Sequence, residues 1–139
     1  MSSGWGVDNI NDILALAVRV NTAYKNAPNK YTHIAEEVNS LQIGKAAQHF
    51  GGTTLSDDVR RDGKEILEGC RGVLENLDSL LEKYQHLAST NPGEVFKKVQ
   101  LGIEDITTLR ARLKLHTKKL NDFIQRCDTS DYYHFSIFR

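Results

Sequence analysis

With 139 residues, the chain has the length of one ordinary domain, and its 40% hydrophobic and 26% charged residues are typical of a globular rather than a disordered protein. Lysine and arginine together number 18, as do aspartate and glutamate, so the zero net charge gives no reason to expect a nucleic-acid partner. The sequence has no apolar run of about 18 residues and no basic region at its start, so we expect neither a membrane span nor a signal peptide, and a cytoplasmic location.

The first two expected helices cover about residues 7–26 and 29–48. Ala27-Pro28 separates them, because proline removes a backbone donor and disfavours the helical region in the residue before it. So short a connection makes the two helices antiparallel neighbours. The apolar positions expected on the inner side of the first helix are Ile10, Ile13, Leu14, Ala17, Val18 and Ala23 or Tyr24. Those of the second helix are Tyr31, Ile34, Ala35, Val38 and Leu41.

The third expected helix carries the longest apolar stripe of the chain. Gly51-Gly52 marks a loop, after which Thr54 or Ser56 caps a helix that ends near His86. Small and apolar side chains recur along it at alternating steps of four and three, which places them on one side of a helix for roughly eight turns. These residues are Val59, Gly63, Ile66, Cys70, Val73, Leu77, Leu80, Tyr84 and Leu87. A helix of this length needs other helices to pack against.

The fourth expected helix starts at Asn91-Pro92-Gly93-Glu94. Asparagine is a preferred N-cap, proline suits the first helical position, and the glutamate completes a capping box. Gly102 can kink or split this helix early in its course. Its inner stripe is Val99, Ile103, Ile106, Leu109, Leu113, His116, Leu120, Phe123 and Cys127.

Four long amphipathic helices joined by short loops predict an all-α antiparallel bundle over residues 1–127. Residues 128–139 differ in kind, because they are aromatic and β-favouring yet too short to form a sheet alone. This C-terminal tail can fold back on the bundle, pair with another chain or be disordered.

No part of the sequence has the residue spacing of an active site, so we expect no enzyme activity, no cofactor and no metal. The five histidines include no HExxH pair, and no Cys–His set has zinc-ligand spacing. His116 can be read as a buried base or ligand, but a core histidine hydrogen-bonded to a neighbouring helix is the favoured interpretation. Cys70 and Cys127 lie on apolar stripes, which favours two buried free thiols over a disulfide or redox switch.

Charge is distributed unevenly between the last two expected helices. Residues 96–127 hold eight basic and three acidic side chains, whereas the far half of the third helix is acidic. The favoured interpretation is that these faces complement each other within the bundle. The alternative is a basic patch for an acidic protein or an anionic membrane. The candidate interaction surface comprises Arg110, Arg112, Lys114, Lys118 and Lys119, with the tail aromatics Tyr132, Tyr133, Phe135 and Phe138.

Three sequence blocks carry a family resemblance. They contain Ile34-Ala35-x-Glu37-Val38, then Glu65-Ile66-Leu67-x-Gly69-Cys70-Arg71, and then Gly102-x-Glu104-Asp105-Ile106. In order and spacing, these blocks resemble the helical N-terminal domain that precedes NACHT, ankyrin and other modules in fungal NOD-like receptor (STAND) proteins. That group is similar to the HeLo and HeLo-like cell-death domains, and the resemblance covers about residues 7–126.

The resemblance implies a non-enzymatic signalling or protein-interaction bundle of a fungal innate-immunity or cell-death-like pathway, with protein partners or self-association. One alternative is a HeLo-like membrane-perturbing executioner that joins an anionic membrane on activation. Another is a secreted or host-directed fungal protein built on the same bundle. The polar side of the first helix weakens the membrane alternative, because Asp8, Asn9, Asn11 and Asp12 make it acidic and amide-rich rather than lysine-rich.

Overall fold

A computed structural model describes the backbone of residues 5–26, 32–52, 55–90 and 92–137. Side chains are described for residues 5–26, 33–52, 55–83 and 106–129. The helices are α1 (Val7–Lys25), α2 (Thr32–Asn39), α3 (Ile43–Gly52), α4 (Asp57–Thr90) and α5 (Pro92–Ile137). No strand occurs in the described backbone, and the predicted all-α bundle is confirmed.

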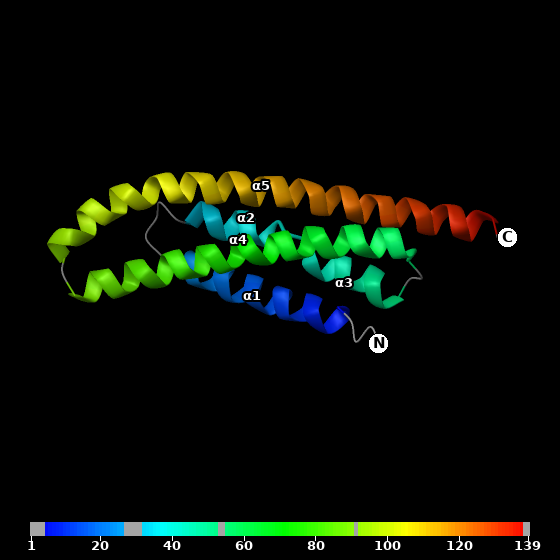
Figure 1. Ribbon diagram of the computed structural model, residues 1–139, viewed down its shortest axis with the longest axis horizontal. Coiled ribbons are helices and arrows are strands. Elements are labelled where there is room, and N and C mark those ends of the chain that lie inside the picture. The colour runs from blue at the N-terminus through cyan, green and yellow to red at the C-terminus, as the bar shows by residue number, and fades with distance from the viewer. Residues whose placement is uncertain (1–4, 27–31, 53–54, 91, 138–139) are drawn as a thin grey trace.

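The helices form four antiparallel arms, and α2 and α3 follow one another as the second arm (Figure 1). The first arm, α1, packs against α2, α3 and α4, while α4 and α5 pack against each other as a long hairpin. Figure 1 shows this hairpin extending along the long axis beyond the end of α1. One core of buried apolar side chains, mostly aliphatic, runs through all four arms.

The second arm is broken where one continuous helix over residues 29–48 was expected, so that prediction is wrong at residues 40–42. The Ser40 hydroxyl donates to the Glu36 carbonyl at 3.0 Å, and the Leu41 N–H donates to the Val38 carbonyl, which tightens the last turn of α2. Leu41 still reaches the core, as predicted. Gly51 and Gly52 form the last residues of α3 rather than a separate loop. The expected start near Asn29, and Tyr31, lie outside the described residues.

The inner side of α1 follows a strict three-four spacing, with Ile10, Ile13, Ala17, Val20 and Tyr24 buried. Val18 was expected among these inner residues, but its side chain is 59% exposed, because it lies off the stripe that Val20 continues. The Tyr24 hydroxyl donates to the Leu77 carbonyl at 2.6 Å and so ties the end of α1 to the middle of α4.

The predicted stripe of α4 lies inward, but the buried surface is wider than a single stripe. Gly63, Cys70, Val73 and Leu77 are buried, while Val59, Ile66 and Leu80 are half-buried. Three fully or largely buried leucines were missed, namely Leu67, Leu74 and Leu81. The reason is that α4 packs against α1 as well as α5, which buries two adjoining flanks. The side chains of Tyr84 and Leu87 lie outside the described residues.

The structure defines both ends of α4 more closely than the sequence did. Ser56 caps its start, where the Val59 N–H donates to the Ser56 hydroxyl at 3.3 Å, and Thr54 lies outside the described residues. The helix ends at Thr90, one turn later than expected.

The backbone of α5 is one helix from Pro92 to Ile137, so Gly102, which could have kinked or split it, does not split it. Its inner stripe is confirmed from Ile106 to Cys127, and Ile124 joins it. Residues 128–137 continue the helix, so no break in the backbone separates the expected tail from the bundle. The side chains of Val99, Ile103, Tyr132, Tyr133 and Phe135 lie outside the described residues, as does Phe138 altogether.

Candidate interaction surface

Arg110, one of the five predicted surface cations, forms an ion pair between two helices. Its Nη2 lies 2.6 Å from Glu37 Oε1, and its Nε lies 3.1 and 3.2 Å from the two carboxylate oxygens of Glu37. This bidentate hydrogen bonding raises the pKa of Arg110 and joins α5 to α2. Arg110 therefore contributes to the bundle itself rather than to a free surface.

One described ion pair joins α4 to α5, Arg126 to Asp62 at 3.0 Å, but Asp62 lies near the start of α4 and not in the far, acidic half on which the expected complementarity rested. The other acidic residues of α4 with described ion-pair partners bind elsewhere. Asp78 pairs with Arg19 of α1 at 2.9 Å, and Glu75 pairs with Arg71 of its own helix at 3.0 Å. Thus, among the described side chains, the acidic residues of α4 pair with only one cation of α5.

The remaining predicted cations form an outward surface on α5, which we term the basic face: Arg112, Lys114, Leu115, Lys118 and Lys119. Arg112 is half-buried and the three lysines are exposed. Within the described part of the chain, none of these four cations has a hydrogen-bond or ion-pair partner. Leu115 lies among them with half of its side chain exposed. This combination of unpaired positive charge and an exposed leucine suits a partner with acidic and apolar side chains.

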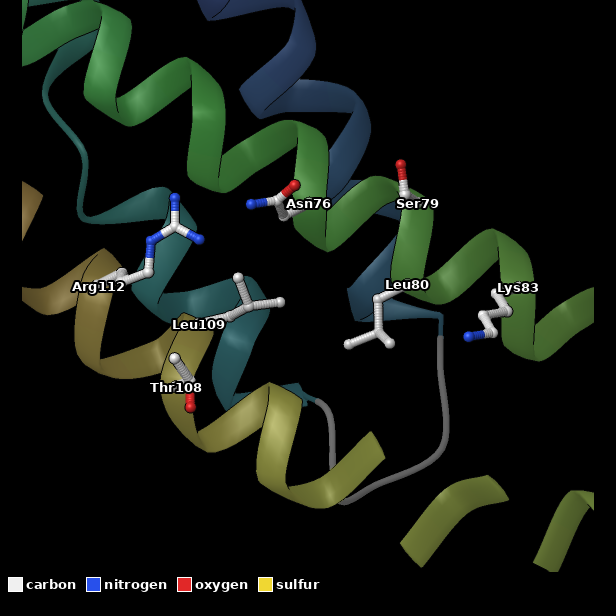
Figure 2. A pocket seen from close by; sticks show the side chains of 7 residues that line it. All are labelled: Asn76, Ser79, Leu80, Lys83, Thr108, Leu109 and Arg112. Atoms are coloured by element: carbon white, nitrogen blue, oxygen red, sulfur yellow. The ribbon is translucent and has the colours of Figure 1, made fainter. Parts of the chain in front are cut away.

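A groove between α4 and α5 adjoins this basic face (Figure 2). It has a volume of about 390 Å³ and is open to solvent. Its lining residues are Asn76, Ser79, Leu80, Lys83, Thr108, Leu109 and Arg112. Figure 2 shows Leu80 and Leu109 pointing into the space between the two helices, with Arg112 at one end and Lys83 at the other.

The α4 side of the groove was missed by sequence reasoning. Leu80 had been assigned to the core, although it is only half-buried. A signal was present: Asn76, Ser79 and Lys83 recur at the same three-four spacing as the stripe and give one flank of α4 a polar border. Only Arg112 of this groove belongs to the predicted surface.

His116 packs against α4 as expected. The predicted hydrogen bond to a neighbouring helix is not made by Nδ1, which is buried and has no hydrogen-bond partner among the described residues. The ring lies over Gly69, where an added Cβ would stand 2.5 Å from His116 Cε1. Burial first, and the charges of Lys119 and Arg112 next, lower the pKa of His116. The ring is therefore held neutral against the helix, and glycine at position 69 makes the close approach possible.

This environment predicts that the bundle loses stability in mild acid. Because the pKa of His116 is lower in the folded chain, the unfolded chain binds a proton first as pH falls below about 6.5, and the free energy of unfolding decreases. Urea titrations at about pH 7.5 and 5.5 should show a smaller loss for His116→Gln than for the wild type. The matched control is His33→Gln at an exposed histidine, which should keep the wild-type loss. If the wild type and His116→Gln lost the same free energy of unfolding between the two pH values, the acid sensitivity would not come from His116.

Cys70 and Cys127 are buried and reduced, with no disulfide between them, as predicted. Burial raises the pKa of Cys70 to about 12. At about pH 8, a thiol with the ordinary pKa is roughly one-quarter thiolate, so we expect native Cys70 to react with iodoacetamide about a thousand times more slowly than in urea. Mass spectrometry of tryptic peptides separates Cys70 from Cys127. Equal rates in buffer and in urea would show that Cys70 is accessible.

Among the described residues, no group of three or more His, Cys, Asp or Glu side chains is placed to hold a metal ion. In the part of the chain that the structure describes, no helix has the length and apolarity needed to cross a membrane. Comparison with known proteins found no matching family model, no matching curated protein and no matching solved structure. The resemblance to fungal receptor domains stays a prediction from the three sequence blocks.

Proposed function

We propose that this chain is a non-enzymatic protein-interaction bundle whose binding surface is the basic face of α5. The observation that carries the proposal is the unpaired charge of that face beside the exposed Leu115. The inner side of the same helix is filled by Leu113, Leu120 and Phe123. Since packing accounts for the inner residues and ion pairs for Arg110 and Arg126, the outer residues are the ones left for recognition.

The three sequence blocks support the wider setting of the proposal: signalling in a fungal innate-immunity or cell-death-like pathway, in the cytoplasm. In that setting the partner is a protein with an acidic surface, because a cationic patch raises the association rate with such partners and disfavours basic ones. A second copy of the chain is a weaker candidate, since two basic faces would repel each other.

Affinity capture from an extract of the source organism tests the proposal with two charge-matched variants. Lys118→Glu/Lys119→Glu reverses two charges on the basic face, whereas Lys45→Glu/Lys64→Glu reverses two charges on exposed lysines of α3 and α4. The wild type and the α3/α4 control should capture the same proteins. We expect the basic-face variant to capture at least tenfold less of these proteins. Equal capture by both variants would overturn the proposal.

The membrane-perturbing alternative has its own readout. Vesicles containing phosphatidylserine should retain an entrapped dye when the purified protein is added at neutral pH. Rapid leakage that Lys118→Glu/Lys119→Glu abolishes would assign the basic face to anionic lipid instead of protein.

A further inference from the structure

We infer that the groove between α4 and α5 receives one amphipathic helix of a protein partner. That helix presents two neighbouring leucine-like side chains to the groove, with one acidic side chain before them and one after them. The inference rests on the proposed function and deepens it by naming the chemistry of the partner. The groove residues that carry the inference are Leu80, Leu109, Lys83 and Arg112.

The floor of the groove is apolar and incompletely covered. Leu109 is buried at 8% exposure, but Leu80 is only half-buried although it lies on the inner stripe of α4. Both side chains point into the groove in Figure 2. An apolar side chain laid over them would remove their remaining apolar surface from water, which favours binding.

The two ends of the groove are cationic. The guanidinium of Arg112 lies beside Gly72, where an added Cβ would stand 3.9 Å from its Nη2. Lys83 lies eleven residues further along α4, about 16 Å at 1.5 Å per residue, and its side chain turns back toward Leu80 in Figure 2. Within the described residues neither cation has an ion-pair partner, so no described carboxylate neutralises either charge.

This spacing matches one face of a helix. Glutamates seven residues apart lie about 10 Å apart on the same side, and the reach of their side chains and of Lys83 covers the remaining distance. Residues three and four positions after the first glutamate lie between them and meet the leucine floor. The recognised pattern is therefore Glu-x-x-Leu-Leu-x-x-Glu on a helix.

The shape of the groove favours a helix over a small molecule. Small-molecule sites enclose most of their ligand, whereas this groove is open to solvent and runs between two antiparallel helices. An open, apolar-floored channel of this kind suits the helix-in-groove mode of recognition. The second groove, between α1 and α4, lacks the same character, because its cation, Arg19, is already paired with Asp78 at 2.9 Å.

The test uses fluorescein-labelled, alanine-based helical peptides whose binding is followed by fluorescence anisotropy at physiological salt. The first peptide carries Glu-x-x-Leu-Leu-x-x-Glu; one control replaces both glutamates by lysine and another replaces both leucines by alanine. We expect the first peptide to bind at least tenfold more tightly than either control. Lys83→Gln/Arg112→Gln should weaken its binding at least tenfold, and the charge-matched Lys45→Gln/Lys64→Gln should leave it within twofold of the wild type. Circular dichroism verifies that both variants fold.

Several outcomes would overturn the inference. Equal binding of the three peptides, or equal loss in both variants, would show general charge attraction rather than a groove. Binding to phosphatidylserine vesicles that depends on Lys83 and Arg112, with no peptide binding, would assign the groove to lipid. If Lys83→Gln/Arg112→Gln captures the same partners as the wild type while Lys118→Glu/Lys119→Glu does not, the groove inference fails and the proposed function stands. If no partner is captured but the first peptide binds as expected, the groove stands and the proposed function fails.

Discussion

Replacing Leu113 by alanine is expected to lower the free energy of unfolding by about 2–5 kcal/mol. Leu113 has no exposed surface and lies at the middle of the inner stripe of α5, where α5 packs on α4. Truncation removes buried methyl groups and leaves a cavity, because helices packed on several sides relax only partly around it. Urea unfolding followed by far-ultraviolet circular dichroism measures the loss.

Leu115→Ala is the matched control, since it makes the same substitution two residues away on the same helix. The Leu115 side chain is 50% exposed on the basic face, so its loss should cost about 0.5 kcal/mol or less. Similar losses in the two variants would contradict the described orientation of α5. The same pair separates packing from recognition, because Leu115→Ala should weaken partner capture without weakening the fold.

The second large effect is expected from Gly63→Ala. An added Cβ at position 63 would stand 2.5 Å from Phe123 Cζ and 2.8 Å from Phe50 Cζ, so both rings would have to shift. Alanine is favoured over glycine in a helix by about 1 kcal/mol, but overpacking of a buried site costs about 1–3 kcal/mol. The difference is a net loss of up to about 2 kcal/mol in the free energy of unfolding, which urea titration measures.

Gly72→Ala, on the same helix, is expected to have the opposite effect on the free energy of unfolding. An added Cβ there meets nothing closer than Arg112 Nη2 at 3.9 Å, an ordinary contact. Helix propensity alone should then raise the free energy of unfolding by about 0.5–1 kcal/mol. If both glycine variants were stabilised, the close approach of the two phenylalanine rings to α4 would be refuted.

Phe50 and Phe123 also belong to an aromatic cluster that includes Trp5. The Trp5 ring lies edge-on to Phe50 at 5.7 Å, and the Trp5 indole N–H donates to Glu68 at 2.6 Å. The Phe50 and Phe123 centroids are 6.0 Å apart. Gly63 thus makes room for a contact between α3, α4 and α5 that no spacing within a single helix could reveal.

Helical periodicity predicted the core where one helix faces one neighbour. The stripe of α5 from Ile106 to Cys127 is the clearest example, because α4 is the main neighbour of α5, with smaller contacts to α2 and α3. Periodicity was less informative for α4, where contact with both α1 and α5 buries Leu67 and Leu74 beside the expected residues. A single stripe has one centre, whereas a helix with partners on two flanks buries two adjoining rows.

The candidate surface was predictable only in part. An excess of basic residues on the last helix indicated where Arg112, Lys118 and Lys119 would lie, but not which cations are neutralised. Arg110 pairs with Glu37, 73 positions earlier in the chain, and that pairing depends on how α2 meets α5. The groove likewise needs residues from two helices, so Lys83 could not be placed opposite Arg112 before the packing was known.

Hydrogen–deuterium exchange tests the central claim, that this bundle binds a protein through the outer side of α5. The measurement compares the free chain with the chain bound to a partner that the wild-type protein captures. Our account predicts slower exchange in residues 76–83 and 108–119 on binding, and little change in α1 and α3. Slower exchange confined to α1 and α3, with residues 108–119 unchanged, would contradict it.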